Sequence, residues 1–127
     1  MDDNWNVIFS YTRAQAISDG VLIDVTAQAR EMGFKVPAAI TDNLFHTYIE
    51  PPAGLEGEGQ SVEGRLHDVF SVLLATIRSS GAAADYAEID VLFLIEPGKH
   101  KKIRIIAVIG PGDAGEPVLT IMLPGDD

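Results

Sequence analysis

The sequence contains no cysteine, which excludes disulfide bonds, a thiol nucleophile and a thiolate metal site. No apolar run approaches the ~18 residues that a membrane-spanning helix needs, so we expect no contact with a membrane. Residues 1–4 lack the basic start of a secretory signal peptide. From these absences we expect a cytoplasmic protein.

Basic residues are also few, since 9 lysines and arginines stand against 19 acidic residues, and the formal net charge is -10. A chain this acidic repels a phosphate backbone over most of its surface, so direct binding to nucleic acid is not expected. Hydrophobic residues make up 46% of the 127 residues. That proportion and this length predict a single globular domain over residues 1–127.

The first half of the chain is divided by glycines and prolines into short segments. Thr12 and Gln15 have the spacing of a capping box, and Gly20 suits the end of the helix that they begin. Similar signals recur further along the chain. The expected elements are a helix between Thr12 and Gly20, a strand at 21–23, a helix at 27–32 and a helix from Thr41 to Pro51.

One segment, residues 53–60, combines three glycines with two glutamates and predicts a flexible loop inside the domain. A long helix over about 61–80 follows it. Apolar residues recur there at three- and four-residue steps, which is the pattern of an amphipathic helix with one buried face. They are Val62, Leu66, Val69, Phe70, Leu73, Leu74 and Ile77.

The period changes to two in the last third, where apolar residues alternate with others between short glycine- and proline-containing connections. Short connections favour an antiparallel meander, at about 87–123, over parallel pairing. We therefore predict an α+β fold: a three- to four-stranded, mainly antiparallel sheet packed by the helix at about 61–80 and by short N-terminal helices. Apolar residues such as Leu92 and Ile106 on the second face of this sheet indicate that it is partly covered too.

No motif identifies a reaction, a metal or a cofactor. His46 and Glu50 are four residues apart on a predicted helix, but two ligands are too few for zinc. His67 and Asp68 are adjacent and so point to different sides of their helix. The glycine-rich residues 110–116 fit neither of the phosphate-binding loop patterns. The prediction is no metal, no cofactor and an unknown catalytic set, with an enzyme less favoured than a binding protein.

Basic residues are concentrated in one place. Four of the 9 lie within six residues of a predicted strand connection, namely Lys99, Lys101, Lys102 and Arg104. This basic cluster is a candidate contact for a phosphate or for a partner's acidic surface. The alternative is that the lysines keep an apolar sheet soluble by discouraging edge-to-edge pairing.

Tyr11 and Arg13 are two further binding candidates, because they lie beside a predicted helix start whose free N–H groups attract an anion. Arginine in a first turn opposes the helix dipole, which suggests a role other than helix formation. The alternative is ordinary packing.

Two stretches carry a resemblance to a known family, residues 7–26 and residues 110–124. The sequence resembles a family of small uncharacterised bacterial proteins, a domain of unknown function often encoded on plasmids, phages and other mobile elements. The resemblance implies a bacterial cytoplasmic protein of one domain. It supplies no reaction and no catalytic residue.

Three hypotheses follow. The leading one is a non-enzymatic, acidic binding or regulatory protein that acts through a protein partner, as an accessory or counter-defence factor of a mobile element. The second is a small enzyme with a site near Tyr11, Arg13, Asp24 and Glu116, which would join the two family-like ends of the chain. The third is a homodimer that pairs through a sheet edge. The sequence does not decide the partner or the oligomeric state.

Overall fold

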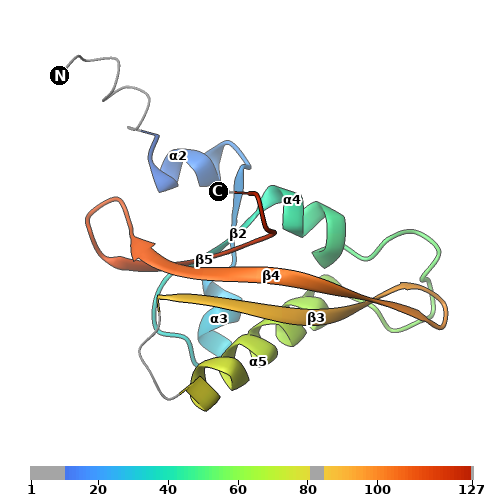
Figure 1. The fold of residues 1–127 in the computed structure, drawn as a ribbon. Helices are drawn as coiled ribbons and strands as arrows, with labels where there is room; N and C mark the ends of the chain where they lie inside the picture. The colour runs from blue at the N-terminus through green and yellow to red at the C-terminus, as the bar shows by residue number, and fades with distance from the viewer. Residues whose placement is uncertain (1–10, 81–84, 127) are drawn as a thin grey trace.

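A computed structural model describes residues 11–80 and 85–126 and shows a twisted sheet with helices on its two faces (Figure 1). The α+β class predicted from the sequence is confirmed. The elements in chain order are α2 (Arg13–Ser18), β1 (Leu22–Asp24), α3 (Thr26–Glu31), β2 (Ala38–Thr41), α4 (Asp42–Leu44), the π-helical turn η1 (Phe45–Ile49), α5 (Val62–Ser80), β3 (Tyr86–Glu96), β4 (Lys99–Pro111) and β5 (Pro117–Met122).

Within the described residues the sheet has five strands, in the order β1-β2-β5-β4-β3. The predicted antiparallel meander is present as β3, β4 and β5, with Ile89 opposite Ile105 and Ala107 opposite Ile121. The predicted strand number was too small, because β2 adds to β5 in parallel and β1 adds to β2 in antiparallel. The sheet is therefore mixed rather than mainly a three- to four-stranded antiparallel one.

Among the short N-terminal elements, α2 follows its sequence signals closely, whereas the segment from Thr41 to Pro51 follows them less closely. Thr12 and Gln15 form the predicted capping box, and Gly20 has a positive φ of 79° after the helix. The helix expected from Thr41 is instead three α-helical residues followed by the π-helical η1. It still ends before Pro51, with the Glu50 N–H donating to the Phe45 carbonyl.

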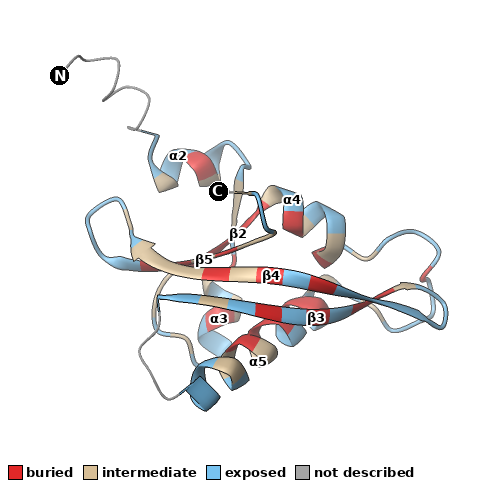
Figure 2. Ribbon diagram, viewed as in Figure 1, coloured by how far each residue is buried: buried red, intermediate tan, exposed pale blue. Residues whose placement is uncertain are grey.

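The core lies between one face of the sheet and the helices α3 and α5 (Figure 2). From α5, Leu66, Val69, Phe70 and Leu73 are buried, as the helical stripe predicts. The sheet supplies alternate residues of β3, β4 and β5, which point to this face because side chains alternate along a strand. They include Ile89, Val91, Phe93, Ile105 and Ile121.

The other face of the sheet is covered only in part. Over β1, β2 and β5 it carries α2, and Ala39 on this face is fully buried. Over β3 and β4 the described part of the chain puts no helix, and Leu92 keeps 61% of its surface exposed. The predicted partial cover of this face is therefore present over β1, β2 and β5, and Leu92 lies outside the covered part. Within the described ranges, no helix has both the length and the apolar character needed to cross a membrane.

Candidate functional site

The basic cluster is divided between the two faces of the β3–β4 hairpin. Lys101 pairs with Phe93 on the core side, where its ammonium lies 6.0 Å from the ring centre of Tyr48. Lys102 pairs with Leu92 on the open face. Lys99 lies at the turn, with its Nζ 3.6 Å from a carboxylate oxygen of Glu96. The cluster is contiguous in sequence but does not form one basic patch on a single face.

Arg104, the last member of that cluster, is neutralised by two carboxylates of the neighbouring strand. Its guanidinium donates to Asp90 at 2.7 Å and to Glu88, while the Tyr86 hydroxyl also donates to Glu88 at 2.8 Å. The hydrogen bonds from Tyr86 and then Arg104 lower the pKa of Glu88, and the bond from Arg104 lowers the pKa of Asp90. Arg104 is thus part of a cross-strand ion cluster rather than an unpaired anion-binding group.

A surface hollow of about 190 Å³ brings together residues from both family-like ends of the chain. Arg13, Asp24 and Glu116 line it, as does Asp113, so the structure unites three of the four residues proposed for an enzyme site. Tyr11 does not line it and donates its hydroxyl to Asp19 instead, at 2.8 Å.

The polar groups of this hollow are occupied by internal hydrogen bonds. The Arg13 guanidinium donates to the Thr120 hydroxyl and to the Leu119 carbonyl, both at 2.7 Å. Burial lowers the pKa of Arg13, against the opposing effect of the nearby carboxylates. Arg13 therefore joins α2 to β5, which accounts for an arginine in the first turn of a helix.

The carboxylates of Asp113 and Asp24 in this hollow also accept internal hydrogen bonds, in their case from backbone N–H groups. Asp113 accepts from the backbone N–H groups of Arg13, at 2.7 Å, and Ala14, at 3.0 Å, and so caps α2 from the β4–β5 connection. Asp24 accepts from the N–H and the hydroxyl of Thr26. No local pattern points to Asp113 as a capping residue, because it lies 100 residues from Arg13, the first residue of the helix that it caps. A catalytic role for this hollow stays a hypothesis.

The histidines form no metal site within residues 11–80 and 85–126, where no group of three or more histidine or acidic side chains is arranged to hold an ion. His46 pairs with Glu50 at 2.6 Å between exposed side chains. His67 lies 3.9 Å from Asp68, and both are exposed.

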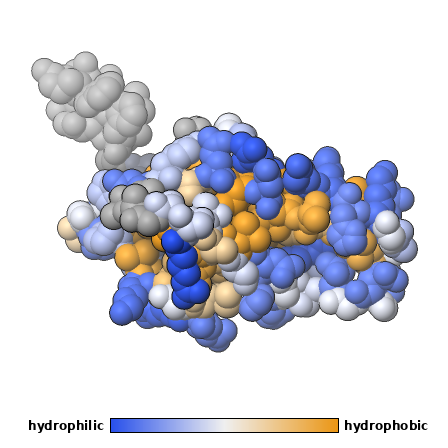
Figure 3. All heavy atoms as spheres, turned by 60° about the horizontal axis from the view of Figure 1, so that its bottom comes forward, coloured by the Kyte–Doolittle hydropathy of each residue, from blue (hydrophilic) through white to orange (hydrophobic). Residues whose placement is uncertain are grey.

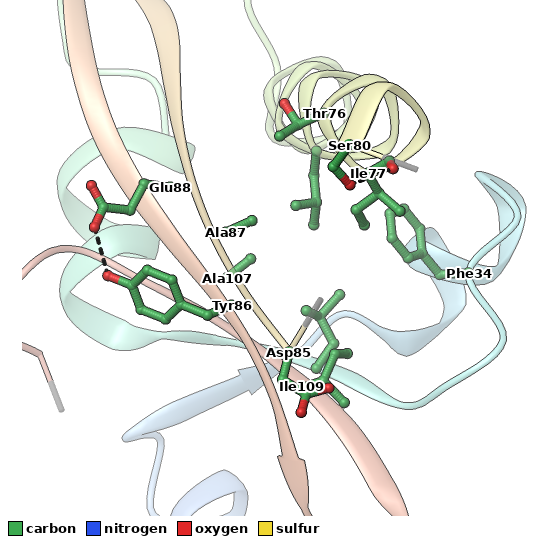
Figure 4. A pocket seen from close by; sticks show the side chains of 12 residues that line it. Phe34, Thr76, Ile77, Ser80, Asp85, Tyr86, Ala87, Glu88, Ala107 and Ile109 are labelled. Carbon is green, nitrogen blue, oxygen red and sulfur yellow. Dashed lines mark hydrogen bonds between the residues drawn. The ribbon is translucent and has the colours of Figure 1, made fainter. Parts of the chain in front are cut away.

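A second cavity, which the sequence analysis missed, lies between the C-terminal half of α5 and the first residues of β3 (Figure 4). Its volume is about 200 Å³, and we call it the α5–β3 pocket. Ala87 and Ala107 are opposite one another in the β3–β4 register, so two small side chains leave space beneath the helix. A pair of alanines in two strands that are rich in isoleucine and valine was the sequence signal that could have indicated this pocket.

The lining of the α5–β3 pocket is apolar inside and polar at the rim. Phe34, Leu73 and Ile77 approach from the helical side, while Thr76, Ser80 and Asp85 lie at the margin. In Figure 4 the Tyr86 and Glu88 side chains point away from the pocket to the open face of the sheet, where they are hydrogen bonded to each other.

The surface around this pocket is unusually apolar for an acidic protein. Figure 3, which turns the α5 side of the molecule forward, shows hydrophobic residues gathered in one broad area with hydrophilic residues around it. Ile77, which lines the pocket, remains 38% exposed, and on the open face of the same sheet Leu92 of β3 remains 61% exposed. Exposed apolar areas with a polar border are characteristic of interaction surfaces.

Comparison with known proteins leaves the activity open. No curated protein and no solved structure shows significant similarity to the chain. A family model, however, matches residues 2–127, almost the whole sequence. The protein therefore belongs to the family of unknown function DUF6573.

Proposed function

We propose that the protein is a non-enzymatic, acidic binding or regulatory protein, and that it contacts a protein partner through the side of the molecule formed by α5 and β3. The observation that carries this proposal is the α5–β3 pocket, which the exposed Ile77 of α5 lines. A second exposed apolar side chain, Leu92, lies further along β3 on the open face of the sheet. An apolar cavity with a polar rim is the usual form of a binding site, and exposed apolar residues beside it extend the contact area.

The charge of the chain supports a protein partner with a basic surface. The net charge is -10, and carboxylates of Asp85, Glu88 and Asp90 lie along β3 and just before it. Complementary charge accelerates encounter between proteins and selects among partners. A partner that meets this side of the molecule is therefore expected to be basic.

The biological setting is part of the same proposal. Because the chain resembles a family often encoded on plasmids, phages and other mobile elements, we propose that it acts in the bacterial cytoplasm as an accessory or counter-defence factor of such an element. Binding to a host protein, without catalysis, is sufficient for a role of that kind.

The test is capture of partners from the native bacterium on the immobilised full chain, at low and at moderate salt. We expect a specific partner whose retention falls at least about tenfold with added salt, since exposed charges are screened beyond ~8–10 Å at moderate ionic strength. Leu92→Lys should abolish retention. Val21→Lys, which alters another exposed apolar side chain (45%) beside the opposite edge of the sheet, should retain the partner.

Two results would contradict the proposal. One is that the wild-type chain retains no specific partner even at low salt. The other is that Leu92→Lys and Val21→Lys retain the same partner equally well, which would place the contact away from β3.

A further inference from the structure

We propose that the outer edge of β3 accepts an extended segment of the partner protein as a sixth strand, with an apolar side chain of that segment in the α5–β3 pocket and basic side chains beside the carboxylates of β3. This inference rests on the proposed function and specifies the partner's chemistry. It is argued from strand geometry, the position of the pocket and the charges along the edge.

Among residues 11–80 and 85–126, no strand lies beside the outer side of β3, which is the last strand of the sheet. The Ile109 N–H donates to the Asp85 carbonyl at 2.8 Å, so the backbone of Asp85 faces β4. Backbone groups of alternate residues face alternate sides of a strand. The N–H and carbonyl groups of Glu88, Asp90 and Leu92 therefore face outward.

The extent of this edge is set by α5. The Leu94 carbonyl, next in the outward series, accepts a hydrogen bond from the guanidinium of Arg65. That bond is independent evidence for the alternation. It also means that the Leu94 carbonyl is already occupied, so the part of the edge that can accept a strand ends before Leu94. The outward groups from Glu88 to Leu92 span five residues, which is the usual length of a strand in a globular protein.

The pocket lies where an added strand would place a side chain. A residue directly opposite Ala87 on such a strand would point to the same face of the sheet as Ala87, which is the face covered by α5. Ala87, Ala107 and Ile77 all line the pocket there. Its volume of about 200 Å³ has room for one large apolar side chain, so main-chain pairing and side-chain specificity occur at one place.

Charge then favours a basic segment. The next residues of the added strand would point to the open face, beside the side chains of Glu88 and Asp90. Three carboxylates lie along this edge, those of Asp85, Glu88 and Asp90. Only two positive groups lie near them, the guanidinium of Arg104 and the ammonium of Lys102. Opposite charges across neighbouring strands stabilise their pairing.

The same charges disfavour a second copy of this chain as the occupant. Two β3 edges related by a two-fold axis pair in antiparallel, which brings Glu88 and Asp90 of one copy close to the same acidic residues of the other. Like charges directly opposite one another destabilise strand pairing. A basic segment of another protein has no such penalty.

The test uses the acetylated, amidated peptide Lys-Val-Lys-Val-Lys-Phe-Lys, which in antiparallel pairing puts its phenylalanine opposite Ala87 and its first lysine opposite Leu92, and the full chain labelled with ¹⁵N. We expect slowed amide exchange at Glu88, Asp90 and Leu92, and chemical-shift changes that extend to Ala87 and Ile77. Replacing the peptide's phenylalanine with alanine should weaken binding about tenfold, which corresponds to ~1.4 kcal/mol. Replacing its lysines with glutamates should abolish binding.

Two variants of one residue separate strand addition from contact with a side chain. Leu92→Pro removes the outward N–H but leaves the pairing with β4 intact, as proline does on edge strands, and should weaken peptide binding at least about tenfold. Leu92→Thr keeps the N–H and should change binding by less than about threefold. Their melting temperatures report whether both remain folded, and a peptide N-methylated at alternate residues tests the same hydrogen bonds on the wild-type chain.

Three outcomes would overturn strand addition: no protection of the β3 amides at millimolar peptide, equal binding of the N-methylated peptide, or a wild-type chain that pairs with itself through β3. If Leu92→Lys abolishes partner capture while the peptide results are negative, this inference is wrong and the proposed function stands. If the wild-type chain captures no partner, the proposed function itself fails.

Discussion

Arg65 shows how one buried side chain joins three parts of the fold. It is 2% exposed and sits in the first turns of α5. Its guanidinium donates to the carbonyls of Tyr48, at 2.7 Å, and Leu94, and to the side chain of Gln60, at 3.1 Å. Burial lowers its pKa, and the ring of Phe93 lies 5.3 Å from its central carbon. The charge is thus accommodated by neutral oxygens and an aromatic face.

Replacing Arg65 with methionine should therefore lower the free energy of unfolding by about 2–4 kcal/mol, because carbonyl groups are left without a donor in a buried region. The control is Arg78→Met on the exposed side of the same helix, which should cost less than ~0.5 kcal/mol. Urea unfolding of both variants measures the difference. Equal stability of the two would show that the guanidinium bonds do not contribute.

Elements with a long and regular pattern were predictable from the sequence, and so were the short elements α2, β1 and α3, which have cap or turn signals, whereas β2 and η1 were not. The helix over 61–80 and the strands of the meander each repeat their period several times, and the structure contains them as α5, β3, β4 and β5. β2 was missed because all four of its residues, Ala38–Thr41, are buried. A parallel strand covered on both faces shows no alternation, and three apolar residues followed by a threonine do not distinguish strand from helix.

The π-helical turn η1 was missed for a related reason. Its apolar residues, Phe45, Tyr48 and Ile49, recur at the three- and four-residue steps that predict an ordinary α-helix. A single wider turn does not change that spacing enough to be recognised in five residues.

The β3–β4 hairpin carries a pH-dependent contribution to stability. In the folded protein the pKa of Glu88 lies below its ordinary 4.5 and that of Asp90 below its ordinary 3.8, so the unfolded chain binds more protons near these values. Stability from this ion cluster is present above the ordinary values and is lost as the pH falls through the lowered ones. Acid should therefore destabilise the protein.

Arg104→Met should reduce that sensitivity to acid, since it removes the hydrogen bonds that lower the pKa of Asp90 and part of those that lower the pKa of Glu88. The decrease in unfolding free energy between about pH 6 and about pH 3 should be smaller than in the wild type. Lys35→Met, which removes the same charge from an exposed position, should leave the wild-type decrease unchanged. A wild-type pH dependence in Arg104→Met would refute the assignment.

For the whole molecule, sequence reasoning identified residues that meet in space better than it identified what they do. Arg13, Asp24 and Glu116 do share a hollow, because α2 and the β4–β5 connection lie side by side. The basic cluster does not act as a unit, because alternation along β4 sends Lys101 and Lys102 to opposite faces. The α5–β3 pocket depends on which residues of distant strands are paired, and that register is a tertiary property.

The acidic edge of β3 also bears on the oligomeric state. Charged residues on an exposed edge strand discourage pairing with another copy, which is a general protection against aggregation. On β3 the charged residues are Glu88 and Asp90. Without them, the exposed apolar side chain of Leu92 would favour association of two copies. We therefore expect the wild-type chain to have a solution mass of 13.6 kDa, that of a single copy.

Removing the ion cluster should release self-association through β3. The triple variant Glu88→Thr, Asp90→Thr, Arg104→Thr replaces charges with a residue that favours strands and changes the net charge from -10 only to -9. Its mass, measured by light scattering, should rise with concentration, and Leu92→Pro added to it should reverse the rise. Glu58→Thr, in the loop at 53–60, also gives -9 and should remain a single copy. A triple variant that stays at 13.6 kDa would mean that something other than charge keeps the β3 edges apart.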